Sequence, residues 1–248
     1  MTEPAPEPDS GGESDLPARP ASWGDVSWPG LWAPLVVIMG AFLAGVLSAV
    51  VWAMSSSGPA DAVVSDAVAA GQVAMWLALA VFSLMTVAST NRTSAVAIAR
   101  LAARVDRGDV LLAVVLLPVV VASGTIVEEV LAHLGLEMDP ESLDFLARPA
   151  VALAAVTVVP AAEELWGRGL IYGAFARHGP VAAVGVSGAL TAAAHLDLVQ
   201  SLSALPGMIV LGWLRHRTGR LAPCVILHAL NNLAAVIWLL GQRPGGPG

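Results

Sequence analysis

Two neighbouring glutamates, Glu163 and Glu164, lie in an otherwise apolar stretch from Val151 to Phe175, where Arg168 is the only other charged residue. The stretch is long enough to cross a bilayer, and each charged group there costs roughly 2.5–3.5 kcal/mol on insertion scales. Ionisable residues that are kept in such segments mark functional sites. Because carboxylates can act as general acids and bases, we expect this pair to carry a reaction.

Helical geometry separates the roles of the two glutamates. Glu164 and Arg168 are four residues apart, so they share one helix face, with the acid on the favourable N-terminal side. Glu163 points about 100° away, as the 3.6-residue repeat requires. We therefore expect Arg168 to neutralise and orient Glu164, and Glu163 to face a polar cavity as the catalytic base. The alternative is a purely structural ion network.

Three more polar residues lie in later apolar segments. His195 is near the end of one predicted helix, and His228 and Asn232 are four apart on one face of another. Because polar groups in lipid face the interior of a helix bundle, these side chains are expected to converge with Glu163. Glu163 lies about 22 Å and His195 about 24 Å from the turn at 178–180, at a rise of about 1.5 Å per residue. The two residues are thus expected at the same depth.

Composition places these residues in a membrane protein. The chain has 248 residues, of which 56% are apolar and 12% charged, as in polytopic membrane proteins rather than soluble domains. The formal net charge is −7, and without a basic stripe the sequence argues against nucleic-acid binding. Cys224, the single cysteine, excludes an intrachain disulfide and has no zinc-type Cys/His spacing around it. The predicted partner is therefore the lipid bilayer, and no nucleic-acid partner is expected.

Runs of about 20 apolar residues cross the hydrocarbon core as helices. The sequence predicts an all-α, polytopic transmembrane bundle of about seven helices. They cover residues 31–54, 67–88, 110–127, 149–176, 181–198, 200–214 and 221–240.

The chain divides into four predicted regions. Residues 1–30 are acidic and proline-rich and are expected to be disordered. Residues 31–148 hold the N-terminal transmembrane helices, residues 149–240 form the helical core with the polar residues above, and residues 241–248 are a short tail.

The basic residues predict the orientation in the membrane, since cytoplasmic loops carry an excess of them. One loop, after the second predicted helix, and one turn, after the sixth, are rich in arginine, whereas the alternate loops are acidic. The loop arginines are Arg92, Arg100, Arg104 and Arg107, and those of the turn are Arg215, Arg217 and Arg220. This alternation predicts a cytoplasmic N-terminus. All 12 basic residues are arginine, which we interpret as codon bias of a GC-rich bacterium, so the expected location is the bacterial inner (plasma) membrane.

The polar residues also form three ordered motifs: Glu163-Glu164-x-x-x-Arg168, then His195, then His228-x-x-x-Asn232. Their types, spacing and order resemble the CPBP intramembrane proteases, also called the CAAX-protease/bacteriocin-processing or Abi family.

The resemblance extends from Pro149 to Leu240 and is especially close from Gly207 onward. One position departs from the family pattern. Thr191 stands four residues before His195, where the family usually has Phe. This change could alter the cavity wall or supply a hydroxyl partner for His195.

The resemblance implies an intramembrane endopeptidase that acts on a peptide or protein at the membrane. Glu163 and His195 would activate a water molecule. His228 and Asn232 would stabilise the oxyanion on the scissile carbonyl, a role that fixed donors perform well in a dry site. The ion pair of the first motif would hold its helix and charge in place.

The resemblance favours a glutamate mechanism without a cofactor. Zinc is the alternative, because Glu163, His195 and His228 could bind it and leave a position for water. The His-Glu-x-x-His pair that would make zinc a specific prediction is absent from the sequence.

Two other functions stay open. Intramembrane Glu and His can relay protons in a proton-coupled transporter, although transporters commonly show inverted repeats, which this sequence lacks. The other alternative is a catalytically silent membrane protein with an immunity or scaffolding role.

Overall fold

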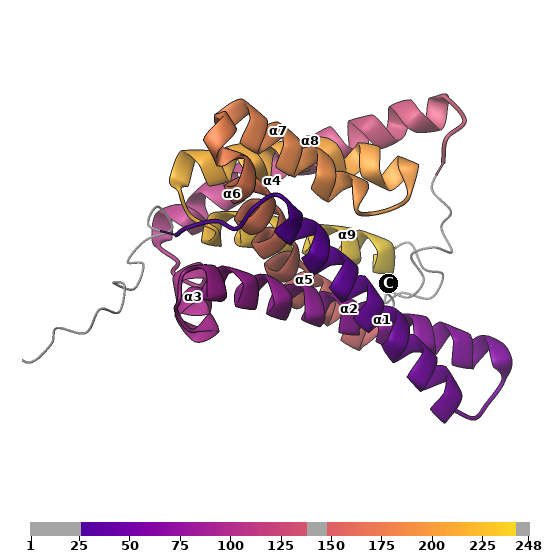
Figure 1. Cartoon of the computed structure of the whole chain (residues 1–248). Coiled ribbons are helices and arrows are strands. Elements are labelled where there is room, and N and C mark those ends of the chain that lie inside the picture. The colour runs from indigo at the N-terminus through magenta and orange to yellow at the C-terminus, as the bar shows by residue number, and fades with distance from the viewer. Residues whose placement is uncertain (1–25, 138–147, 242–248) are drawn as a thin grey trace, which may run out of the picture.

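The computed structural model of the chain describes residues 26–137 and 148–241, and every regular element in these ranges is a helix. Six helices are long and apolar enough to cross a membrane, and a seventh apolar helix is shorter. The predicted all-α, polytopic bundle is therefore confirmed (Figure 1). The chain is a multi-pass membrane protein.

The first two long helices form an antiparallel pair, α1 (Trp32–Ser55) and α2 (Ala60–Thr90). They approach closely at Gly45 and Gly71, where a Cβ added to Gly45 would lie 2.8 Å from the carbonyl oxygen of Gly71. Small residues at such crossings let helix backbones pack tightly in lipid, where the hydrophobic effect does not drive association.

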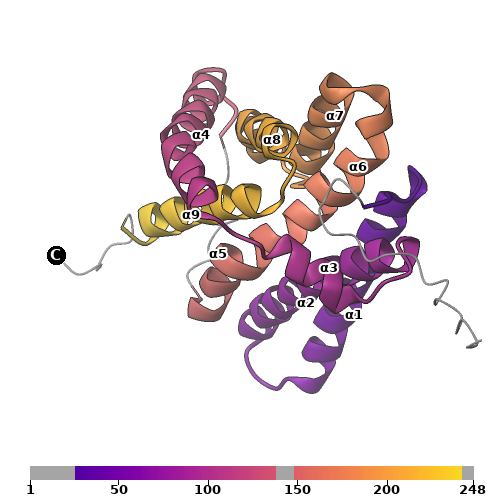
Figure 2. The ribbon, with the colours of Figure 1, turned by 90° about the vertical axis from the view of Figure 1, so that its left-hand side faces the viewer.

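A second group of helices comes from the later part of the chain. It contains α4 (Arg107–His133), α7 (Pro180–Ala193), α8 (Leu198–Thr218) and α9 (Ala222–Gly241). Helix α8 packs between α4 and α7, and α9 packs across α4 (Figure 2).

One continuous helical rod lies between the two groups (Figure 2). It begins as α5 (Pro149–Glu164), widens into a π-helical segment, η3 (Leu165–Ile171), and ends through α6 (Tyr172–Phe175) and the 3-10 turn η4 (Ala176–His178). In its most apolar 18-residue stretch, 56% of the residues are buried, whereas the corresponding share in the other long helices is at most 44%. The two glutamates at the end of α5 thus lie in the most enclosed helix of the bundle.

Several predicted helix boundaries differ from the structure, and two of these differences affect the polar residues. Helix α7 ends at Ala193 rather than at residue 198, because the chain turns there and Leu196 adopts a left-handed conformation with φ of 61°. Helix α8 continues past Leu214 to Thr218 and is ended by Gly219, whose φ of 67° fits the left-handed position that ends many helices. As a result, His195 follows its helix, and Arg215 lies inside a helix instead of a turn.

The short helix α3 (Ala95–Ala102) was not predicted. Ser94 caps its N-terminus by accepting a hydrogen bond from the Ala97 amide, and the helix buries Ile98 and Leu101. Eight residues are too few for a hydropathy window designed for membrane spans. The helix nevertheless belongs to the arginine-rich loop and fixes that loop against the bundle.

The predicted disordered tail extends too far at its C-terminal end. Residues 1–25 lie outside the described residues, but Val26 is buried and Ser27 makes two hydrogen bonds to the side chain of Asn91. Trp28 lies against Gly169 and Gly173 of the central rod so closely that Gly173 has no room for a Cβ. Figure 1 shows this segment crossing α6. The acidic, proline-rich composition of residues 1–30 predicts disorder, although the segment ends with a few apolar residues that pack against the bundle.

An ion cluster joins the N-terminus of α4 to the turn before α9. Asp106 and Asp109 form a capping box at the start of α4, and the Arg220 guanidinium pairs with both carboxylates, at 2.6 Å in the case of Asp109. The hydrogen bond from Arg220 lowers the pKa of Asp106 below its ordinary value of 3.8, and the Asp109 amide adds to this effect.

This cluster predicts an acid-sensitive contribution to stability. Because the folded pKa of Asp106 is depressed, its stabilisation is present above pH 3.8 and is lost as the pH falls below that value. Asp106→Asn keeps a good N-cap but does not titrate. We expect thermal unfolding, followed by circular dichroism, to show a steeper stability loss below pH 3.8 for the wild type than for this variant. Parallel losses in the two proteins would contradict the assignment.

Candidate active site

Glu164 is fully buried at the end of α5 and has two partners. Its Oε1 lies 3.3 Å from Nη1 of Arg168, one helical turn further on, and 2.9 Å from Nδ1 of His228 on α9. The predicted contact between Glu164 and Arg168 is therefore present. The structure adds His228 to the same carboxylate oxygen, so the first and third motifs meet at one point.

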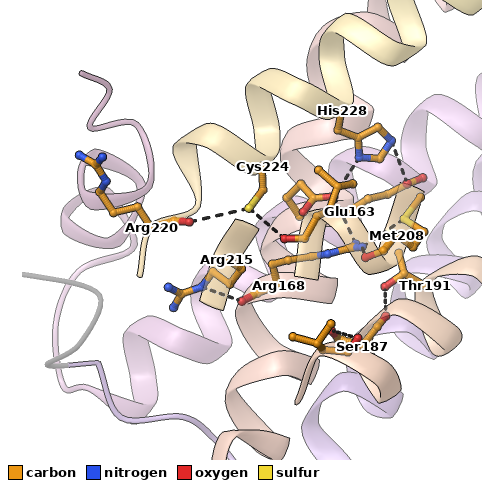
Figure 3. A network of polar contacts seen from close by, with 12 residues as sticks. Glu163, Arg168, Ser187, Thr191, Met208, Arg215, Arg220, Cys224 and His228 are labelled. Atoms are coloured by element: carbon orange, nitrogen blue, oxygen red, sulfur yellow. Dashed lines mark hydrogen bonds and ion pairs between the residues drawn. The ribbon is translucent and has the colours of Figure 1, made fainter. Parts of the chain in front are cut away.

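Glu163 keeps part of its surface exposed, with 19% of its side chain accessible. Its Oε2 lies 3.7 Å from Nε2 of His228, so this imidazole is positioned between the two carboxylates (Figure 3). Such an arrangement fixes the ring through one nitrogen and directs the other nitrogen towards Glu163. A carboxylate beside an oriented imidazole is suited to moving a proton.

Arg168 is also fully buried and links the site to a third helix. Its Nη2 donates a hydrogen bond of 2.6 Å to the backbone carbonyl of Met208 on α8 and lies 3.2 Å from the Met208 sulfur. A buried guanidinium needs several acceptors in addition to one carboxylate. Arg168 therefore anchors the rod to α8 as well as balancing the charge of Glu164.

The rod changes from α- to π-helical pitch directly after the two glutamates, and Arg168 lies inside the widened segment. Pro160 interrupts the α-helical ladder one turn earlier because it has no N–H. Gly167 lies so close to α7 that a Cβ there would be 2.7 Å from the Thr191 hydroxyl oxygen. π-Helical turns inside α-helices occur frequently at functional sites.

Thr191 forms part of the wall on the α7 side of this segment. Its hydroxyl donates to the Ser187 carbonyl at 2.5 Å, within its own helix (Figure 3). Two effects of Thr191 were predicted: a change in the wall of the site, or a hydroxyl partner for His195. The close approach to Gly167 fits the first effect. The hydroxyl hydrogen bond goes to Ser187 and not to His195.

The structure does not bring His195 into the group formed by the glutamates and His228. The ring is half-buried in the turn after α7, and its Nδ1 lies 3.0 Å from the Ala192 carbonyl, within that turn. The prediction of a shared depth assumed that the helix continues through His195. Because α7 ends two residues earlier, the direction of the side chain follows from the turn rather than from helical spacing.

Asn232 lies one helical turn from His228, as predicted, and contacts the rod. Its Nδ2 donates a hydrogen bond of 2.9 Å to the Ala155 carbonyl of α5. Asn232 thus ties α9 to α5 through one of its two amide hydrogens. The side-chain amide carries a second N–H donor.

The structure shows whether the three predicted zinc ligands, Glu163, His195 and His228, lie close enough together to bind a metal ion. Within residues 26–137 and 148–241, no three His, Cys, Asp or Glu side chains form a group that could hold a metal ion. Glu163 and His228 lie close together, but His195 is not grouped with them. The three predicted zinc ligands do not converge in this structure.

Comparison with known proteins identifies the segment that contains these residues. Residues 145–234 match the family described as Type II CAAX prenyl endopeptidase Rce1-like. No curated protein and no solved structure matches the chain. The matched range includes all three motifs, α5 to α8 and the first part of α9, and the predicted resemblance is confirmed. Residues 145–234 of this multi-pass membrane protein are therefore similar to the Rce1-like family, which is a family of proteases.

Proposed function

We propose that the chain is an intramembrane endopeptidase in which Glu163 activates the water that attacks the scissile peptide bond. The observation that carries this proposal is the unequal environment of the two glutamates. Glu164 is fully buried against Arg168 and His228, while Glu163 remains partly accessible beside the same imidazole. A base must reach both solvent and substrate, and Glu163 is the member of the pair that meets this requirement.

The remaining residues divide the other steps between them. Glu164 orients His228 through Nδ1, so Nε2 faces the place where Glu163 would hold the water. His228, once protonated, and the second amide hydrogen of Asn232 would donate to the oxyanion. The family resemblance assigns the second contact to the water to His195, which lies in the turn after α7.

The proposed mechanism uses no metal ion. Glu163 supplies the base, and the donors named above supply the charge stabilisation that a metal would otherwise provide. Because the three candidate ligands do not converge, no step is assigned to a metal. A metal chelator is therefore expected to leave the cleavage rate unchanged.

The substrate is proposed to be a peptide or protein at the bacterial plasma membrane. The arginine-rich loop containing α3 and the ends of η4 and α8 would face the cytoplasm, which puts the N-terminus on that side as well. The family description names prenylated CAAX substrates, and bacteria generally lack them, so the proposal concerns the reaction and not a prenyl group.

Comparative analysis of released peptides tests this function. Membranes from cells that express the wild type or Glu163→Ala, at equal protein levels, would be incubated with and without a chelator, and the released peptides identified by mass spectrometry. We expect a set of peptides that requires Glu163 and is insensitive to the chelator. Identical peptide sets from the two proteins would overturn the proposal, and loss of the set with the chelator would overturn its metal-free form.

A further inference from the structure

Arg215 is a buried cation in the last turn of α8, although its sequence context suggested a solvent-exposed turn. Only 5% of the residue is exposed, in contrast to the exposed Arg217 two positions later. Burying an arginine is costly unless its donors are satisfied. The contacts of Arg215 therefore need an explanation, and they lead to the candidate active site.

The Arg215 side chain reaches the backbone of Arg168. Its Nε donates a hydrogen bond of 3.2 Å to the Arg168 carbonyl, inside the π-helical segment (Figure 3). A backbone carbonyl has two lone pairs, so it can accept a side-chain donor together with a helical amide.

Helix α8 thus holds Arg168 at two points. The Met208 carbonyl accepts from the guanidinium of Arg168, and Arg215 donates to its backbone. Met208 and Arg215 are seven residues apart, or two turns of one helix face, a separation of about 10 Å. This spacing lets one rigid helix fix both the backbone and the head group of the arginine that neutralises Glu164.

Tyr172 supports Arg215 from the rod itself. The Arg215 guanidinium lies 5.5 Å from the centre of the Tyr172 ring, a distance at which cation–π attraction operates. The Tyr172 hydroxyl lies 3.2 Å from Nδ1 of His216. The planar guanidinium is thereby held in one orientation, which a flexible lysine ammonium would not reproduce.

We propose that Arg215 is a positioning residue that fixes the π-helical segment and, through Arg168 and Glu164, sets the orientation of His228 and the accessible carboxylate of Glu163. The inference rests on the proposed function, since it assigns Arg215 a part in the same site. Arg215 touches no reacting atom in this scheme. Its loss should lower the turnover number and leave substrate binding nearly unchanged.

Four variants test this role: Arg215→Lys, Arg215→Gln and, as matched controls at the exposed neighbour, Arg217→Lys and Arg217→Gln. The proteins would be reconstituted in lipid nanodiscs, with a synthetic peptide that spans a Glu163-dependent cleavage site as the probe. We expect kcat to fall roughly tenfold in Arg215→Lys and further in Arg215→Gln, with KM within about twofold of the wild type. Both Arg217 variants should match the wild type.

Hydrogen exchange provides a second measurement that does not depend on activity. The amides of residues 165–171 should exchange several-fold faster in both Arg215 variants than in the Arg217 controls. Arg215→Lys keeps the positive charge, so it decides the matter if Arg215→Gln does not fold. Wild-type kcat and wild-type exchange in Arg215→Lys would overturn the inference.

The two proposals fail in different ways. If the proposed protease function is wrong, no Glu163-dependent peptide exists for any variant, and the exchange measurement alone decides whether Arg215 fixes the segment. If only the positioning role is wrong, the wild type cleaves the probe and the Arg215 variants cleave it equally well.

Discussion

Glu163→Gln is expected to lower kcat by roughly 10²–10⁴-fold, the contribution of a general base, while the unfolding temperature stays close to that of the wild type. The substitution replaces one carboxylate oxygen by an amide and hardly changes the volume. Glu163 is partly accessible, and its contact with Nε2 of His228 is 3.7 Å long, so little folding energy depends on it. Steady-state cleavage of the probe peptide in nanodiscs gives kcat.

Cys224 provides a convenient reporter of unfolding in the same samples. It is the only cysteine of the chain and is fully buried, so a thiol-reactive fluorophore labels it only when the helices separate. Coincident labelling curves for the wild type and Glu163→Gln, together with lost turnover, are the expected combination. A folded Glu163→Gln protein with normal turnover would exclude Glu163 as the base.

The hydrophobic helices could be predicted because a membrane span must satisfy its own backbone hydrogen bonds, which demands a long apolar run. The features that were missed are set by local conformation. Apolar residues continue past Ala193, so hydropathy could not indicate that the chain turns there with Leu196 in a left-handed conformation. The amphipathic α3 is too short to produce a membrane-span signal.

The site was predictable to the extent that it depends on spacing within one helix. The pair Glu164 and Arg168 follows from a four-residue separation, and the meeting of His228 with the first motif follows from the tendency of polar groups to gather inside a bundle. The position of His195 was not predictable from spacing, because it depends on where α7 ends.

The position of Arg215 inside α8 has one indication in the sequence. A charge normally ends an apolar run, which favours a turn at Arg215. Gly219 is a typical residue just past a helix end, and it would have extended the sixth predicted helix to Thr218. Arg215 would then share a face with Met208. Met208 and Arg215 both contact the π-helical segment, and no residue pattern in the sequence predicts that segment.

Glu164→Gln should differ from Glu163→Gln in stability, with a large loss of stability in addition to a loss of turnover. Glu164 and Arg168 are both fully inaccessible, and removing one partner of a buried ion pair leaves an uncompensated charge. Such changes cost about 3–5 kcal/mol of unfolding free energy. Turnover falls as well, because His228 loses the carboxylate that orients its ring. Cys224 labelling on heating measures the first effect and peptide cleavage the second.

Glu163→Gln is the matched control, since it makes the same chemical change one residue away. The comparison separates the proposed site from a purely structural ion network, in which both glutamates would serve stability and neither would be needed for cleavage. Equal destabilisation by the two substitutions would support that network and contradict the division of roles. If instead Glu164→Gln alone unfolds early while Glu163→Gln is stable and inactive, the fully buried carboxylate maintains the fold and the accessible one performs the chemistry.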